Sequence, residues 1–198
     1  MKKIYFSLLI SAVASSVAFS QSLSFGVRGG INIAKETASS GSTSVSSDSR
    51  VGLMLGTYLT VMTSDKFGIQ PELVYSSFGG SASISGQTVS DSFNYLSVPV
   101  LLRYNLSENF NIHAGPQLGI LLSATSSAGS NSVDIKDQVN GVDFGGAFGL
   151  GADFGSFNAG ARYYLGFSNL IKNVPQGLDL KQTNSAIQLF VGYTLFKK

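Results

Sequence analysis

Hydrophobic and polar residues alternate along eight segments of this 198-residue chain. In the third segment, Ile69 and Leu73 fall on one parity and Glu72 on the other. Such alternation indicates β-strands with one apolar face, because successive side chains of a strand point to opposite sides. Each segment approximates the ~9–11 residues that a tilted strand needs to cross a bilayer. The predicted strands are 24–34, 51–62, 67–77, 92–104, 110–124, 142–154, 157–168 and 185–196.

The connections between these segments alternate in length. The short ones are 63–66, 105–109 and 155–156, and the long ones are 35–50, 78–91, 125–141 and 169–184. An up-and-down barrel in a membrane has one rim of short turns and one of longer loops. The pattern therefore predicts an all-β fold, an eight-stranded antiparallel up-and-down transmembrane β-barrel formed by one domain over residues 21–198.

All six charged residues within the predicted strands fall on the parity opposite the apolar row. An outward charge in lipid would cost a few kcal/mol near the midplane, whereas opposite charges inside a narrow lumen can pair. Since eight strands leave an interior only wide enough for side chains, we favour a charge network that plugs the lumen over a gate for small solutes. The predicted network is Arg28, Glu72, Arg103, Asp143, Asp153 and Arg162, with Gln70, His113, Gln117 and Gln188 as polar lumen neighbours.

Composition decides between a membrane barrel and a soluble one. A soluble lipocalin-like barrel would enclose its apolar side chains and expose a densely charged exterior. Here only 12% of residues are charged, 23 are glycine, and the second face is too poor in Lys and Glu to be a solvated exterior. Aromatic residues at the short-turn ends predict a periplasmic girdle in the bilayer interface. Its members are Phe25, Phe67, Tyr104, Phe110, Phe154 and Phe157.

The first twenty residues have the pattern of a secretory signal peptide. Lys2 and Lys3 precede an apolar stretch over 4–19, and Ala18 and Ser20 supply the small residues of a cleavage site. The stretch is too short and too rich in serine for a transmembrane anchor. Its removal subtracts two of 13 basic residues and leaves 11 against 11 acidic ones, so no basic footprint for nucleic acid remains. We predict the cell outer membrane, with the long loops extracellular.

Candidate chemistry is sparse. The chain has no cysteine, which excludes disulfides and thiolate sites. His113 is the only histidine, and catalysis would require a positioned partner and access for a substrate, so we interpret it as a polar lumen side chain. The glycine-rich stretch 145–151 continues the strand alternation and is not a phosphate loop. Five loop aspartates lack calcium-loop spacing and are interpreted as solvated charges: Asp48, Asp91, Asp134, Asp137 and Asp179. No enzymatic activity, cofactor or metal is predicted.

Five segments together resemble the PorT-type outer-membrane β-barrel family of the Bacteroidota. They follow one another through nearly the whole chain after the signal peptide, at residues 26–34, 71–76, 96–104, 114–119 and 161–164. The resemblance implies an eight-stranded barrel; the relative that gives the family its name takes part in protein secretion across the outer membrane, but these segments mark the barrel and not that role. The aromatic end of the last strand, 193–196, resembles the signal that barrel-assembly machinery recognises, although two lysines follow it.

Three classes of function remain open. The first is a structural or interaction barrel whose long loops contact surface partners or glycans, with an accessory part in secretion left open. The second is a narrow pore or a barrel that transports a small ligand, and the third is a membrane enzyme. We favour the first class.

Overall fold

The computed structural model describes residues 22–84, 86–174 and 178–198, so the predicted signal peptide lies outside the described residues. Within these ranges, one 3-10 turn, η1 (Lys136–Gln138), accompanies the strands. No helix in these three ranges has the length and apolarity to cross a membrane. The strands are β1 (Ser22–Ser40), β2 (Thr43–Ser46), β3 (Asp48–Met62), β4 (Phe67–Phe78), β5 (Gly80–Ile84), β6 (Gln87–Asn105), β7 (Phe110–Ala128), β8 (Asn131–Asp134), β9 (Val142–Phe154), β10 (Phe157–Gly166) and β11 (Leu180–Lys197).

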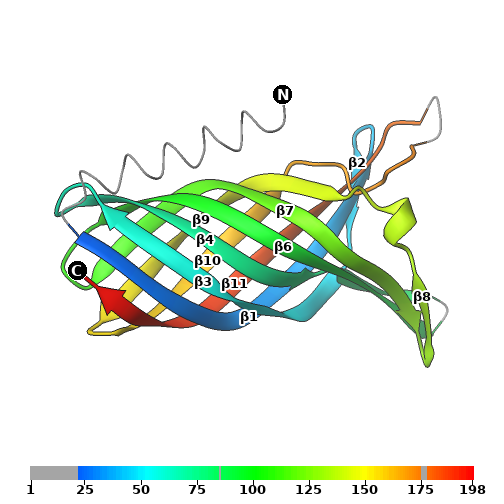
Figure 1. The fold of residues 1–198 in the computed structure, drawn as a ribbon. Coiled ribbons are helices and arrows are strands. Elements are labelled where there is room, and N and C mark those ends of the chain that lie inside the picture. The colour runs from blue at the N-terminus through cyan, green and yellow to red at the C-terminus, as the bar shows by residue number, and fades with distance from the viewer. Residues whose placement is uncertain (1–21, 85, 175–177) are drawn as a thin grey trace.

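Eight of these strands form a closed antiparallel ring. Its order is β1-β11-β10-β9-β7-β6-β4-β3, and β3 pairs again with β1. Figure 1 shows the first strand in blue lying beside the last in red, where β1 and β11 pair from Ser24–Lys197 to Ser40–Leu180. The predicted eight-stranded up-and-down ring is confirmed.

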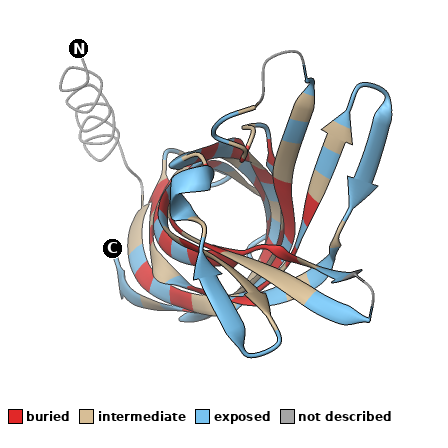
Figure 2. Cartoon of the chain, turned by 90° about the vertical axis from the view of Figure 1, so that its right-hand side faces the viewer, coloured by how far each residue is buried: buried red, intermediate tan, exposed pale blue. Residues whose placement is uncertain are grey.

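The two ends of the barrel differ, and we call them the short-turn end and the long-loop end. The described chain begins and ends at the short-turn end, whereas β2 and β8 lie at the opposite end (Figure 1). Figure 2, which looks onto the long-loop end, shows hairpins rising from the ring. They form because β1, β3, β6 and β7 continue beyond the outward apolar side chains and pair there with the short strands β2, β5 and β8.

The predicted boundaries were wrong at this long-loop end. Segment 35–50 was expected to be a loop, but β1 runs to Ser40 and returns through β2, with Thr37 Oγ1 3.0 Å from Ser46 Oγ. Likewise β6 begins at Gln87 and β11 at Leu180, whereas β10 ends at Gly166, before residue 168. In the strands that are longer than predicted, serine and threonine pairs across neighbouring strands stabilise the added residues. The sequence has no apolar alternation there from which the extension could be predicted. Only β9 has the bounds expected, 142–154.

The inward and outward faces follow the predicted parity. Large apolar side chains point outward and are exposed, among them Leu53 (69%), Leu102 (68%) and Val191 (65%). Buried positions alternate with exposed ones around the ring in Figure 2. Five of the six predicted girdle rings are exposed at the short-turn end, and Tyr104 is half-buried with its ring centroid 4.8 Å from that of Phe67. Their place at a bilayer interface stays a prediction.

Candidate functional site

The centre of the lumen holds a carboxylate between two arginines. Arg28 Nη1 on β1 donates to Glu72 Oε1 on β4 at 2.5 Å, and Arg162 on β10 donates to both Glu72 oxygens at 2.8 and 3.0 Å. Gln70 Nε2 adds a 2.7 Å bond to Glu72 Oε1. The three charged side chains are 0–3% exposed. We call Arg28, Gln70, Glu72 and Arg162 the central cluster.

Aromatic rings pack against the arginines of the central cluster. The Arg28 guanidinium carbon lies 4.5 Å from the ring centroids of both Tyr58 and Phe190, which gives cation–π attraction in a site without solvent. Phe190 also lies 5.2 Å from the Arg162 guanidinium. At Gly149 on β9, a Cβ would clash with Ala161 O and lie 2.8 Å from Arg162 Cα. This position is therefore glycine because the backbone of β10 approaches it closely.

A second ion pair lies at the short-turn end. Arg103 Nη2 donates to Asp153 Oδ2, and the same oxygen accepts from Asn111 Nδ2 at 3.1 Å. Arg103 Nε donates to Asn105 Oδ1 at 3.0 Å. The Arg103 and Asp153 side chains are 15% and 30% exposed, so solvent screens this pair more than the central cluster.

Asp143 stands apart from both groups. It is 1% exposed, and Asn184 Nδ2 donates to its Oδ2 at 3.1 Å, but none of the described basic side chains pairs with it. The single network of six charges predicted from the sequence is thus wrong in its extent. The register of the tilted strands joins three of the six at mid-height, two near the short turns, and leaves Asp143 toward the long loops.

The polar lumen residues are placed as follows. His113 Nε2 accepts from Arg162 Nε at 3.3 Å, and its Nδ1 lies 3.3 Å from Asn111 Oδ1. Gln188 Nε2 donates to Asn32 Oδ1 at 3.0 Å, and Gln117 is 2% exposed with no hydrogen-bond partner for its Oε1. His113 therefore joins the central cluster to the group at the short-turn end.

The long-loop end of the lumen is closed by an apolar cap that the sequence reasoning missed. Phe78 and Tyr164 stack there with centroids 5.3 Å apart, and Val139 and Leu170 from two loops are buried above them. Backbone hydrogen bonds join these loops, from Asn140 N to Leu170 O at 2.8 Å and from Lys172 N to Gln138 O at 3.1 Å. The available signal was a set of large aromatic residues on the inward parity, which has no place in a purely polar lumen.

Glu36 is a buried acid that the sequence reasoning placed in a loop. It continues the inward parity of β1 and is 6% exposed. Its neighbour Lys35 is exposed on the outward parity, beyond the outward-facing apolar side chains of the ring, which we call the apolar band. Gln182 Nε2 donates to Glu36 Oε2, and Oε1 lies near the Gly80 backbone without a hydrogen bond of normal geometry. Burial, and secondly the nearby charge of Asp91, raise the pKa of Glu36 to about 7.

This raised pKa predicts a pH-dependent stability. Between the ordinary pKa of 4.5 and about 7 the folded chain holds a proton on Glu36 that the unfolded chain has released. The stabilisation is therefore complete below pH 4.5 and is lost as the pH rises to 7, with a slope of at most about 1.4 kcal/mol per pH unit. Denaturant unfolding of Glu36→Gln in lipid vesicles should show a flatter pH profile over this range than the parent chain. An unchanged profile would contradict the assignment.

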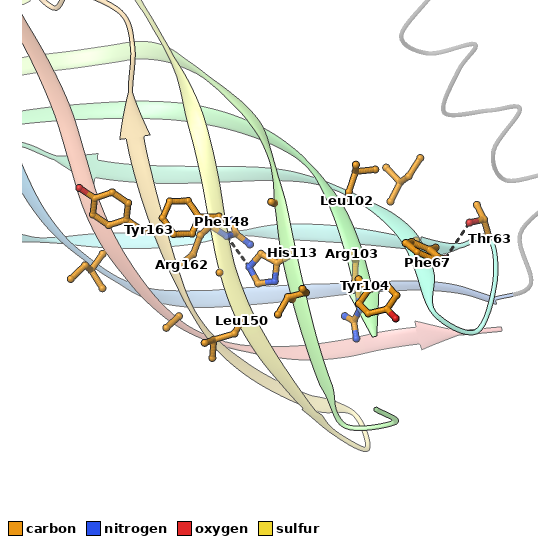
Figure 3. Close-up of a pocket in the computed structure, with 17 residues that line it drawn as sticks. Thr63, Phe67, Leu102, Arg103, Tyr104, His113, Phe148, Leu150, Arg162 and Tyr163 are labelled. Carbon is orange, nitrogen blue, oxygen red and sulfur yellow. Dashed lines mark hydrogen bonds between the residues drawn. The ribbon is translucent and has the colours of Figure 1, made fainter. Parts of the chain in front are cut away.

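A large hollow lies on the outside of the wall. It has a volume of about 940 Å³ and follows β4, β6, β7, β9, β10 and β11. Figure 3 shows outward side chains such as Leu102, Phe148 and Leu150 around it, with the Arg162–His113 hydrogen bond in the wall behind. Because its lining is almost wholly apolar, this hollow suits acyl chains and lacks the convergent polar groups of a ligand site. Within the described ranges, no three His, Cys, Asp or Glu side chains gather as metal ligands.

Comparisons with known proteins agree with this geometry. The family model described as outer membrane protein beta-barrel domain matches residues 19–172. Neisserial surface protein A has a similar structure, with 13% identity over 87% of this chain and 99% of its own, and a TM-score of 0.52. Ail, the attachment invasion locus protein of Yersinia pestis, covers 86% of this chain and 97% of its own at 15% identity, with a TM-score of 0.49. At 13% identity, the likeness to Neisserial surface protein A shows the fold alone. No curated protein sequence matches the chain.

Proposed function

The chain belongs to the outer membrane protein beta-barrel domain family, and from that premise we propose that it is a sealed barrel with a structural or interaction role. The central cluster carries this proposal. Glu72 is bonded from β1 and from β10 at once, so its side-chain bridges cross the lumen at mid-height. Opening a path would require a buried arginine to give up its only carboxylate partner, which costs several kcal/mol.

The same proposal includes an orientation. Residues 21–198 form the mature domain after removal of the signal peptide, and the long-loop end faces the cell exterior, as in other barrels whose long loops are extracellular. Insertion would use the barrel-assembly machinery, which would recognise the aromatic end of β11.

The hairpins of the long-loop end would supply the interaction surface. They are stiffened by cross-strand hydroxyl pairs, such as Ser127 Oγ to Ser132 Oγ at 3.1 Å, and expose Val45 (68%) and Val133 (61%) at their edges. A PorT-type accessory part in secretion is the finer form of this hypothesis. Photocrosslinking from position 133 in intact cells should capture surface or secretion proteins, and labelling of lipid alone would argue against this surface.

A conductance measurement tests the seal. Purified protein in planar bilayers is expected to give no steady single-channel current, because the central cluster and the apolar cap both close the lumen. Phe190→Ala, which removes a ring that packs against the central cluster, serves as a comparison and should also give no current while the apolar cap is intact. Regular current steps from the parent chain would overturn the seal and favour the narrow-pore alternative.

A further inference from the structure

A second cavity lies in the mouth of the barrel at the long-loop end. Its volume is about 360 Å³, and its lining includes Asp91, Phe93, Asp137, Val139, Leu170 and Gln182. We call it the mouth pocket. Asp91 and Phe93 belong to β6 and Gln182 to β11, strands on opposite sides of the eight-membered ring, so the pocket spans the mouth.

The roof of the mouth pocket is held in place by backbone bonds. Val139 and Ile171 form a bridge between the two loops, and Leu170 N donates to Gln182 O at 2.8 Å. Leu170 is 2% exposed and Val139 8%, so the roof is anchored in the apolar cap. A preformed cavity of this size, partly apolar and with a few polar groups, has the properties of a small-ligand site.

The charged groups of the mouth pocket are negative, and its other polar side chains are the amides of Gln138, Asn173 and Gln182. Asp91 and Asp137 supply carboxylates, and none of the described lining residues is basic. The buried Oδ1 of Asp91 accepts no hydrogen bond. Lys136 Nζ donates to Leu122 O at 2.7 Å and Arg50 Nη1 donates to Ser77 Oγ at 3.2 Å, and none of the described basic side chains forms an ion pair with Asp91. The buried carboxylate oxygen of Asp91 therefore lacks a hydrogen-bond donor, and a positively charged donor would suit it best.

Glu36 adds a second buried carboxyl group next to the mouth pocket. It is bonded to Gln182, a lining residue, and its own Oε1 lacks a hydrogen bond of normal geometry. Burial, and secondly the charge of Asp91, raise the pKa of Glu36 to about 7, and none of the described basic side chains forms an ion pair with either carboxyl group. A bound cation would offset their repulsion.

We propose that the mouth pocket binds a small organic ammonium compound with a short apolar body. The ammonium group would donate to Asp91, and the apolar body would lie against Phe93, Val139 and Leu170. The Phe93 ring adds a surface that attracts cations. This inference goes beyond the sealed-barrel proposal, because binding in the mouth requires no passage through the lumen.

Titration calorimetry of the full mature chain in nanodiscs tests this site. The probe is 2-phenylethylamine, and 2-phenylethanol is its neutral counterpart of nearly equal size. We expect saturable binding of the amine at pH 8 and at least tenfold weaker binding of the alcohol. Equal binding of the two compounds, or no binding of the amine at millimolar concentration, would overturn the proposal.

Matched variants locate the binding. Asp91→Asn should weaken amine binding at least tenfold, whereas Asp48→Asn, an exposed aspartate at the same end outside the pocket, should leave it unchanged. Asp137→Asn serves as a second lining variant in case Asp91→Asn does not fold, which the heat-modifiable gel shift reports. If the Asp48 variant lost as much affinity as the lining variants, nonspecific charge attraction would explain the signal and the pocket would be excluded.

Discussion

Replacing Glu72 with glutamine is expected to destabilise the folded barrel by about 3–5 kcal/mol, the cost of leaving a buried charge without its partner. The substitution preserves shape but leaves Arg28 and Arg162 facing each other in the middle of the lumen with no anion between them. Both guanidinium groups are almost fully buried, so water cannot replace the lost carboxylate.

Denaturant unfolding in lipid vesicles, followed by circular dichroism and by the heat-modifiable gel shift, measures this loss. Asp153→Asn is the matched control, because its partner Arg103 lies in a more solvated pair and its loss should cost about 1 kcal/mol or less. Equal midpoints for the two variants would refute the view that the central cluster stabilises the closed ring.

A charge introduced on the outer wall should have the second largest effect. Val191→Arg on β11 is expected to destabilise the barrel by about 2–4 kcal/mol, the cost of an arginine near the bilayer midplane. Val45→Arg on β2 should change stability by no more than about 0.5 kcal/mol, because that hairpin lies beyond the apolar band, in water.

These two valines form a close match. They are 65% and 68% exposed in the isolated chain, so area alone predicts no difference between them. Only the surrounding medium separates them, lipid at Val191 and water at Val45. Parallel unfolding of both variants in vesicles gives the comparison. If both were tolerated equally, and if the parent chain remained monomeric in buffer without detergent, the lipid-facing assignment of the wall would fail.

Alternation along the strands was sufficient to predict the ring and its two faces. Arg28, Glu72 and Arg162 were placed in the lumen by parity alone, and the structure has all three buried there. Parity works because lipid penalises polar atoms on one face of every strand, a constraint that acts on each residue separately.

Which side chains contact one another inside the lumen depends on the tilt and stagger of the strands, and alternation does not reveal either. Strand tilt and stagger decide which levels of different strands meet, and a shift of two residues preserves parity while changing every lumen neighbour. For this reason the sequence could not predict that Arg28 forms an ion pair with Glu72, or that Asp143 lies apart from both.

Beyond the apolar band the strands lie in water, so lipid no longer requires apolar side chains on the outer face. Glu36 and Asp91 lie where strands continue in water, held by hydroxyl pairs and backbone bonds rather than by an apolar face. Continuing the parity of β1 by two residues past Ala34 would have placed Glu36 in the lumen, but no alternation marked that continuation.

The seam between β1 and β11 has a consequence for how the chain folds. Asn32 and Gln188, 156 residues apart, bond across it, so this joint belongs to the most distant contacts of the molecule. Contacts between residues so far apart in sequence form slowly, because the chain loses the entropy of closing a long loop before the contact stabilises it. Until then β1 and β11 each present an unpaired edge, the kind of template on which chains aggregate. The interval before closure is therefore when the nascent barrel most needs protection from other copies of itself.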